Sequence, residues 1–226
     1  MVCVFLRSIV NEGKIIKEIF GDKTDRSYLC VVMATAEKTR QFIIEKAASI
    51  INQKGMAGTS ISDIMAATKL AKGGIYGNFE NKDEICREVF AYLMKGLNDG
   101  IQHVLLSKPT PKEKLLALLD HYRDLAVNNM GGCPMQNFGT ESDDTDPFIQ
   151  GLVQDAVKLT QNRLSQLIKD GIQAGQFKDS VNPKEMGIKI FALVEGGILT
   201  SRVFGNNQQM KLVINMMKAE IEAFSV

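Results

Sequence analysis

Apolar residues recur at intervals of three and four along most of this 226-residue chain, with charged and amide side chains between them. Such spacing places apolar side chains on one face of an α-helix, whereas half-buried strands alternate apolar and polar residues. Only five prolines interrupt the pattern. We therefore expect an all-α fold.

The boundaries of the expected helices follow from glycines, prolines and capping residues. The first apolar face ends before Gly55, Thr59 or Ser60 opens a short helix, and the run Asn-Lys-Asp-Glu from Asn81 opens a long one. Residues 130–147 are expected to form a loop or a loop with a broken helix. The expected helices cover residues 36–53, two short segments between 59 and 79, a long helix from Asn81 that reaches at least Ile101, a helix after Pro109 and Pro111 that runs to about Asn128, and residues 147–175, 183–204 and 207–224.

Residues 1–32 fit this pattern poorly. The stretch MATAEKTRQFI from Met33 has the character of a natural protein start, so we interpret residues 1–32 as an N-terminal extension or a misassigned start. The alternative is a genuine N-terminal helix, because Ile15, Ile16 and Ile19 have helical spacing.

Composition and the spacing of cysteines argue against a disulfide-stabilised, a zinc-binding and a membrane-spanning protein. The chain is 45% hydrophobic and 23% charged with a net charge of +1, which is ordinary for a globular protein and gives no global basic field. Four widely spaced cysteines favour neither a disulfide framework nor a zinc site, and His103 and His121 lack metal-ligand spacing. We expect no cofactor and no metal. Arg7 interrupts the apolar start, so we expect no signal peptide, no membrane span and a cytoplasmic location.

A helical hairpin is predicted between Thr59 and Phe79. Apolar residues lie on both short helices, and the small residues Ala66 and Ala67 stand where the helices would touch. Two short helices crossing steeply are typical of a helix-turn-helix, in which the second helix recognises DNA. From the residues alone, a plain helical hairpin remains open.

The segment TSISDIMAATKLAKGGIYGNFENKDEI, residues 59–85, resembles the DNA-binding segment of TetR-type transcriptional repressors. The resemblance implies a helix-turn-helix domain over residues 33–80 that binds double-stranded operator DNA. It further implies a helical domain over residues 81–226 that forms a homodimer through the last two helices and binds a small-molecule inducer. The protein would then be a repressor that the inducer releases from its operator, and not an enzyme.

The same resemblance assigns DNA contacts to individual residues. Hydroxyls at the start of the first short helix and a lysine at the start of the long helix would contact phosphate, and the second short helix would approach base edges. For the lysines the alternative is a solvated surface charge, and for the tyrosine a half-buried core position. The predicted DNA-binding residues are Thr59, Ser60, Lys72, Gly73, Tyr76, Asn78 and Lys82.

The hairpin also departs from the family pattern. Many members have glycine where this chain has Lys69, a polar cap where it has Ala71, and side-chain-bearing residues at Gly74 and Gly77. Glycines cannot read a base edge, so a helical interaction protein that has lost specific DNA binding remains the alternative function.

Apolar residues of the long helices supply candidates for an inducer pocket, although such residues are more often plain core. Cys133, in a Gly-Cys-Pro pattern resembling one branch of the family, is either a sensor thiol or a buried structural residue. The acidic residues Glu141, Asp143, Asp144 and Asp146 favour a helix-capping loop over a metal site. The predicted ligand-binding residues are Phe90, Met94, Leu97, Leu118, Tyr122, Cys133, Phe138 and Phe191.

Overall fold

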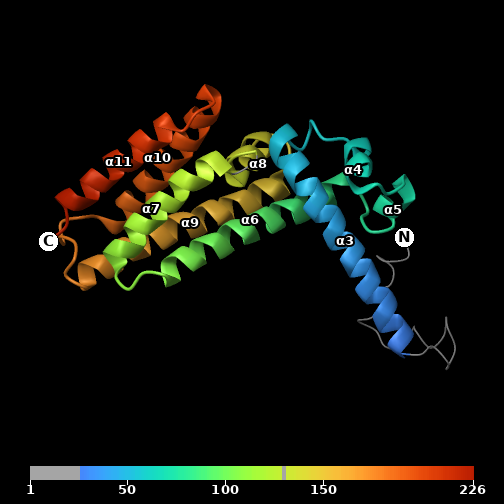
Figure 1. The fold of residues 1–226 in the computed structure, drawn as a ribbon, viewed down its shortest axis with the longest axis horizontal. Helices are drawn as coiled ribbons and strands as arrows, with labels where there is room; N and C mark the ends of the chain where they lie inside the picture. Colours follow the sequence, from blue (N-terminus) through green and yellow to red (C-terminus); the bar gives the residue numbers. More distant parts are fainter. Residues whose placement is uncertain (1–25, 129–130) are drawn as a thin grey trace. The chain divides into compact units, whose positions relative to one another are not determined.

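The computed structural model describes residues 26–128 and 131–226, and this part of the chain is built from α-helices joined by short turns (Figure 1). It confirms the all-α fold. The chain divides into two compact units between Tyr92 and Leu93. The helices are α3 (Arg26–Lys54), α4 (Ile61–Thr68), α5 (Lys72–Tyr76), α6 (Lys82–Leu106), α7 (Pro111–Asn128), α8 (Pro134–Ser142), α9 (Pro147–Gln173), α10 (Pro183–Phe204) and α11 (Gln208–Ala223).

The first helix is longer than the sequence pattern predicts. α3 begins at Arg26 and not near residue 36, because no glycine or proline stands between Arg26 and Lys54 to end a helix. The division into units also falls within α6 and not at its start, so the first turns of α6 belong to the first unit. The predictions made for residues 1–25 lie outside the described residues.

Capping residues set the starts of four helices. Ser60 caps α4, and Asn81 accepts a hydrogen bond from the Glu84 backbone N–H in the first turn of α6. Asp146 caps α9 by accepting from two backbone N–H groups, and Asn182 caps α10 in the same way. Proline follows each of these last two caps, where its fixed φ suits the first helical turn.

Where the sequence predicts a loop, or a loop with a broken helix, over residues 130–147, the structure has the continuous helix α8 over Pro134–Ser142 with turns on either side. Pro134 occupies the first turn of α8, and the buried side chains of Met135 and Phe138 anchor the helix against the rest of the unit. Burial of these two apolar side chains outweighs the weak helix propensity of a segment rich in glycine and short polar residues.

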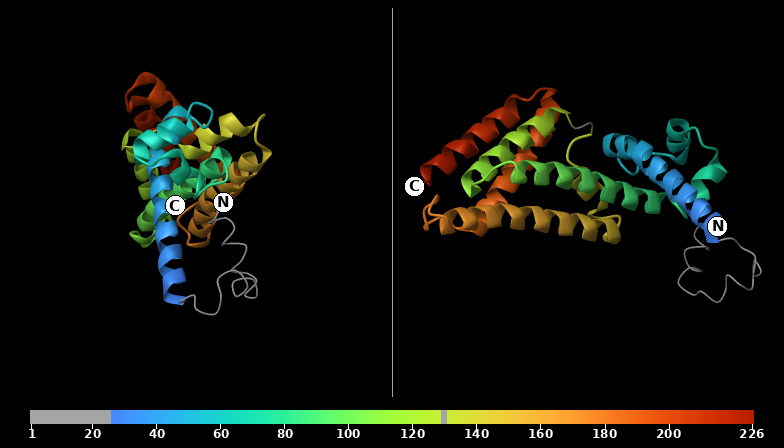
Figure 2. Two further views of the ribbon diagram at one scale, coloured as in Figure 1. Left: turned by 90° about the vertical axis from the view of Figure 1, so that its right-hand side faces the viewer. Right: turned by 60° about the horizontal axis from the view of Figure 1, so that its bottom comes forward.

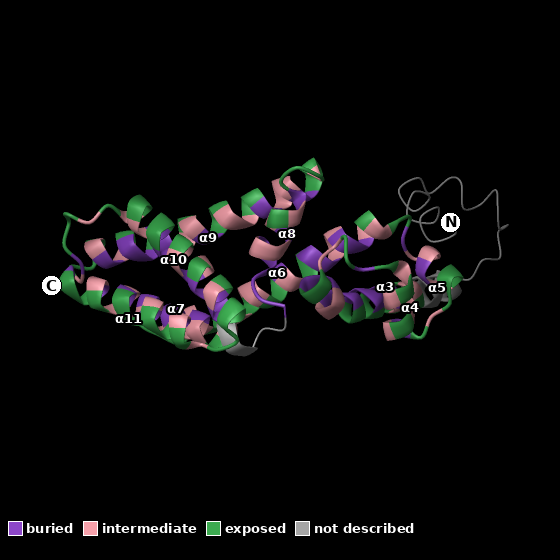
Figure 3. Ribbon diagram, turned by 90° about the horizontal axis from the view of Figure 1, so that it is seen from above, coloured by how far each residue is buried: buried purple, intermediate pink, exposed green. Residues whose placement is uncertain are grey.

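The second unit is a bundle in which α7, α9, α10 and α11 pack side by side (Figures 1 and 2). Buried positions follow one side of each helix, and exposed positions follow the other (Figure 3). Gly197 lets α10 and α11 approach closely, because a Cβ there would stand 2.7 Å from the Met210 sulfur. Among the described helices, none combines the length and the apolar composition of a membrane span.

The apolar stripe of α11 faces the core of its own unit. Met210, Ile214, Met217 and Ile221 are all buried. A different set of apolar side chains is left on the surface of α10 and α11. Its exposed members are Ile188, Leu199, Val203, Phe204, Leu212 and Met216.

Candidate functional site

The start of α4 is fixed by a reciprocal capping box. The Ser60 hydroxyl accepts a hydrogen bond from the Asp63 backbone N–H, and the Asp63 carboxylate accepts one from the Ser60 backbone N–H. Lys54, the last residue of α3, binds the same carboxylate at 2.7 Å. The hydrogen bonds from Lys54 and then from Ser60 hold the pKa of Asp63 well below its ordinary range. The capping box therefore stays assembled at neutral pH.

The turn between α4 and α5 requires a left-handed backbone at Lys69. This residue has φ of +60°, and its N–H donates to the Met65 carbonyl to end α4. Among the described residues other than glycine, Lys69 alone has a positive φ. Glycine adopts a left-handed conformation without a Cβ clash, so it suits this position. A lysine here departs from the family pattern and strains the backbone.

Replacing Lys69 by glycine is expected to raise the free energy of unfolding by about 1 kcal/mol, because glycine adopts this conformation without a Cβ clash. Thermal unfolding of the Lys69→Gly and Lys69→Ala variants measures the effect. Alanine keeps the Cβ and serves as the matched control, so it should leave stability nearly unchanged. Equal melting temperatures for the two variants would contradict the assignment of backbone strain.

Helix α5 has one buried and one accessible face. Ile75 and the following Phe79 are fully buried, whereas Lys72 and Gly73 are exposed and Tyr76 is half-buried. The Lys72 Nζ lies 5.8 Å from the centroid of the Tyr76 ring, within range of a cation–π contact. The ammonium group and the phenol therefore lie close together on α5, with the ammonium group exposed and the ring half-buried.

The remaining predicted DNA-binding residues differ in accessibility. Ser60 is exposed and Lys82 is half-buried at the first turn of α6. The Asn78 side chain donates to the Gly74 carbonyl at 2.8 Å and so binds back to α5. Thr59 is 1% exposed, and its hydroxyl donates to the Gly55 carbonyl at 2.7 Å, so this geometry leaves its side chain no surface for a phosphate.

The three glycines of α5 and its end differ in the space around them. A Cβ on Gly73 would meet nothing within 4 Å, and one on Gly74 would make an ordinary 3.4 Å contact with Leu70. A Cβ on Gly77 would stand 3.0 Å from the Gly73 carbonyl oxygen. Contacts within the described part of the chain therefore explain why position 77 is a glycine, but they do not explain the glycine at position 73.

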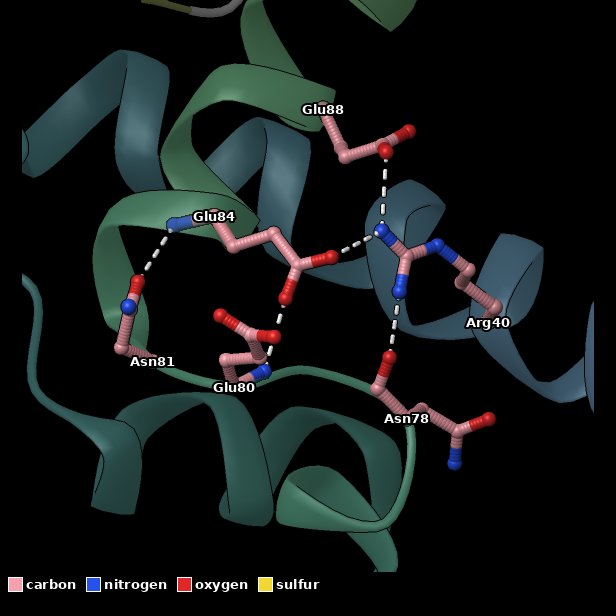
Figure 4. Close-up of polar contacts among 6 residues, drawn as sticks. All are labelled: Arg40, Asn78, Glu80, Asn81, Glu84 and Glu88. Atoms are coloured by element: carbon pink, nitrogen blue, oxygen red, sulfur yellow. Dashed lines mark hydrogen bonds and ion pairs between the residues drawn. The ribbon is translucent and has the colours of Figure 1, made fainter. Parts of the chain in front are cut away.

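Arg40 of α3 joins three segments of the first unit (Figure 4). Its guanidinium donates to Glu84 at 2.6 Å, to Glu88 at 2.8 Å and to the Asn78 carbonyl. It also lies 4.2 Å from the centroid of the Phe79 ring. Burial lowers the pKa of Arg40, but the hydrogen bonds to Glu88 and Glu84, together with the negative charges of these carboxylates, raise it by more, so the side chain stays charged.

The same network orients the connection from α5 into α6. The second oxygen of Glu84 accepts from the Glu80 backbone N–H at 2.7 Å, and the Glu84 N–H donates to Asn81 at 2.8 Å (Figure 4). Sequence reasoning missed Arg40, because a charged residue on an amphipathic helix is ordinarily solvated. Arg40 lies four residues before Ile44 and therefore on the same helix face, but this spacing alone did not distinguish a buried arginine from a solvated one.

The second unit contains a small cavity with a mostly apolar lining and about 30 Å³ of free space. Four predicted ligand-binding residues line it: Leu97, Tyr122, Cys133 and Phe191. The other four do not line it and are buried instead: Phe90, Met94, Leu118 and Phe138. Sequence reasoning missed Glu195, which also lines the cavity and whose only signal was an isolated charge in the apolar run LVEGGIL.

Cys133 is a buried thiol, 5% exposed, which donates to a Glu195 oxygen at 3.1 Å. Burial and the neighbouring Glu195 raise the pKa of Cys133 well above its ordinary value. A thiol held protonated is a poor nucleophile, so this geometry favours the structural interpretation of Cys133. Asp146, in the acidic loop, caps α9, and among the described residues no cluster of side chains has the composition of a metal site.

Comparison with known proteins decides the family. The profile described as "Bacterial regulatory proteins, tetR family" matches residues 43–89, and "Tetracyclin repressor-like, C-terminal domain" matches residues 111–217. A TetR-family transcriptional regulator from Cytophaga hutchinsonii has a similar structure with a TM-score of 0.79 and 34% identity, over 85% of this chain and 97% of that one. The chain belongs to the TetR family.

Two further relatives are also regulators. A TetR transcriptional regulator from Chloroflexus aurantiacus is 30% identical with a TM-score of 0.81, over 85% of this chain and 98% of that one. The fatty acid metabolism regulator protein of Bacillus subtilis is 26% identical over 172 residues, which cover 76% of this chain and 86% of that protein. These homologues are transcriptional regulators, so this TetR-family protein is a DNA-binding regulator and not an enzyme.

Proposed function

We propose that this TetR-family protein is a dimeric repressor whose α5 enters the major groove of operator DNA and which a small-molecule inducer releases. The observation that carries the proposal is the pairing of Lys72 and Tyr76 on the accessible part of α5, beside the buried Ile75 that holds the helix to its unit. In a helix-turn-helix, the second helix presents such side chains to base edges and phosphates.

The other assigned contacts follow from accessibility. Ser60 and Lys82 lie at the first turns of α4 and α6, where unpaired backbone N–H groups also favour phosphate. Lys72 and Tyr76 supply a charge and a hydroxyl, and Asn78 contributes through the loop it stabilises. Thr59 supports the turn before α4 by its bond to Gly55 and makes no direct contact.

The proposed dimer forms through α10 and α11. The exposed residues Ile188, Leu199 and Val203 repeat along one side of α10, and Leu212 and Met216 continue the apolar surface on α11. Gly196 lies on the same side of α10, and a Cβ there would meet nothing within 4 Å in the described part of the chain. An apolar surface of this kind favours an isologous four-helix contact with a second copy.

Release by the inducer is a shift between two states. A ligand bound in the cavity of the second unit weakens operator binding only if it binds more tightly to the conformation that does not fit DNA. The cavity lies in the unit that the family profile matches as the C-terminal domain, which supports its assignment to the inducer.

Selection of bound sequences from random double-stranded DNA tests the function. The expected result is an inverted repeat whose half-sites lie about one helical turn apart, as two copies of α5 require. A dimer in sedimentation experiments that enriches no sequence would contradict the proposal and favour the interaction protein without specific DNA binding.

Gly73 permits a test that separates folding from DNA binding. Gly73→Ala should stabilise the free protein by up to about 1 kcal/mol, because alanine is the better helix former and its Cβ meets nothing. It should weaken operator binding about tenfold, because the added methyl blocks close backbone approach to DNA.

The matched control is Gly74→Ala, whose Cβ faces Leu70 of the same hairpin. It should also stabilise α5 but leave operator affinity within about twofold, a free-energy difference below about 0.5 kcal/mol. Equal losses of affinity in both variants, or none in either, would count against a close approach of Gly73 to DNA.

A further inference from the structure

One wall of the cavity in the second unit carries polar groups that lack partners. Cys133 Sγ donates to Glu195 Oε1 at 3.1 Å, but Glu195 Oε2 is buried and has no hydrogen-bond partner among the described residues. The hydroxyl of Tyr122, a residue 6% exposed, is also buried, and no described residue forms a hydrogen bond with it. Both residues line the cavity, whose remaining surface is mostly apolar. Buried polar groups are ordinarily satisfied, so these two atoms mark a place for a ligand's polar group.

The Glu195 carboxyl at this wall has no ion-pair partner among the described residues, whether lysine, arginine or histidine. The guanidinium of Arg163, whose charge acts on the Tyr122 hydroxyl, donates to Asn98 at 2.9 Å, has no partner for its second nitrogen among the described residues, and does not line the cavity. Burial raises the pKa of Glu195, as expected for a carboxyl without a cation.

The donor and acceptor roles are set by the thiol. Cys133 stays protonated, so it is the donor to Glu195 Oε1, and the ionised carboxyl presents its second oxygen as an acceptor. A ligand that supplies an N–H or O–H group to this oxygen satisfies it, whereas a ligand carboxylate would bring a second acceptor and a like charge to the same wall.

We propose that the cavity binds a small hydrophobic molecule whose N–H or O–H group donates a hydrogen bond to Glu195 Oε2, with the Tyr122 hydroxyl as its second partner. This inference rests on the proposed function, because the molecule would be the inducer. Hydrophobic amines and alcohols fit this chemistry, and carboxylic acids do not.

Binding requires the cavity to enlarge. Its free space of about 30 Å³ holds no more than about two water molecules, so a ring or chain must displace side chains. Met135 and the half-buried Leu97 and Phe191 line it. Methionine adapts its rotamers readily, so this part of the lining can move without breaking a helix.

Four molecules of nearly equal shape test the proposal by calorimetric titration of the full chain. Toluene has no polar group, benzyl alcohol a neutral donor, benzylamine a cationic donor and benzoate an anionic acceptor. We expect benzyl alcohol and benzylamine to bind about tenfold more tightly than toluene, and benzoate to bind least. Tighter or equal binding of benzoate, or no binding of any of the four, would overturn the proposal.

Two conservative variants assign the effect to the named atoms. Glu195→Gln should weaken benzylamine about tenfold and leave toluene unchanged, and Tyr122→Phe should weaken both donor-bearing ligands by less. Equal weakening of all four molecules would indicate a general loss of packing and would overturn the assignment. Thermal unfolding shows whether each variant folds. No DNA is used, so failure here is distinguishable from failure of operator binding.

Discussion

Replacing Arg40 by alanine is expected to lower the free energy of unfolding of the first unit by about 3 kcal/mol, the lower end of the range for breaking a buried ion pair. The side chain of Arg40 is 11% exposed, whereas those of Glu84 and Glu88 are 26% and 40% exposed. Water can therefore replace part of the hydrogen bonding that the two carboxylates lose. The Asn78 carbonyl also loses its donor. The path from α5 into α6 would loosen, and operator binding would fall with it.

Hydrogen exchange of the α3 to α6 backbone, together with urea unfolding, measures this effect. Arg40→Lys should rescue little, because an ammonium group cannot serve two carboxylates, a carbonyl and a ring face in one fixed plane. Lys38→Ala removes an exposed cation from the same helix and is the matched control. Similar protection in the Arg40→Ala and Lys38→Ala proteins would refute the role given to Arg40.

Replacing Tyr76 by alanine is expected to weaken binding to the selected operator about 100-fold. Each of two half-sites would lose a contact worth about 1.4 kcal/mol, and the two losses add in a dimer. The Lys72 ammonium also loses the ring 5.8 Å away that restrains it. Affinity is measured over a series of salt concentrations, because phosphate contacts set the slope of log K against log salt.

Further variants separate the contribution of the Lys72 charge to DNA binding from that of the Tyr76 hydroxyl. Lys72→Ala should reduce the salt slope by about two, one contact per half-site, whereas Tyr76→Phe should weaken binding with the slope unchanged. Lys169→Ala, an exposed lysine of the second unit, should change neither. An affinity and a slope that stay constant in the Tyr76→Ala protein would exclude α5 as the recognition helix, provided that its unfolding curve is normal.

Local signals predicted much of the fold. The pairs Asp146 with Pro147 and Asn182 with Pro183 combine a capping side chain with a residue preset for a first helical turn, so α9 and α10 begin where the sequence predicts. Helix α8 was missed because its segment has the composition of a loop, and the burial of Met135 and Phe138 that stabilises it depends on distant parts of the chain.

The candidate DNA site was predictable in outline because all its residues lie within one short segment. Its exceptions depend on geometry that no local pattern encodes: Thr59 turns inward to Gly55, and Asn78 binds back to Gly74. The residues that line the cavity were harder to predict from the sequence. Cys133 and Glu195 are separated by 62 residues, and only the tertiary fold, in which α8 and α10 both pack against α9, brings the thiol to the carboxyl.

The small volume of the cavity also determines how quickly a ligand enters it. A molecule larger than the free space binds only when the lining has opened, so opening precedes binding. The observed association rate should then level off at high ligand concentration, at a value equal to the opening rate. The time needed to respond to a sudden rise in ligand would be set by the packing of the second unit and not by diffusion.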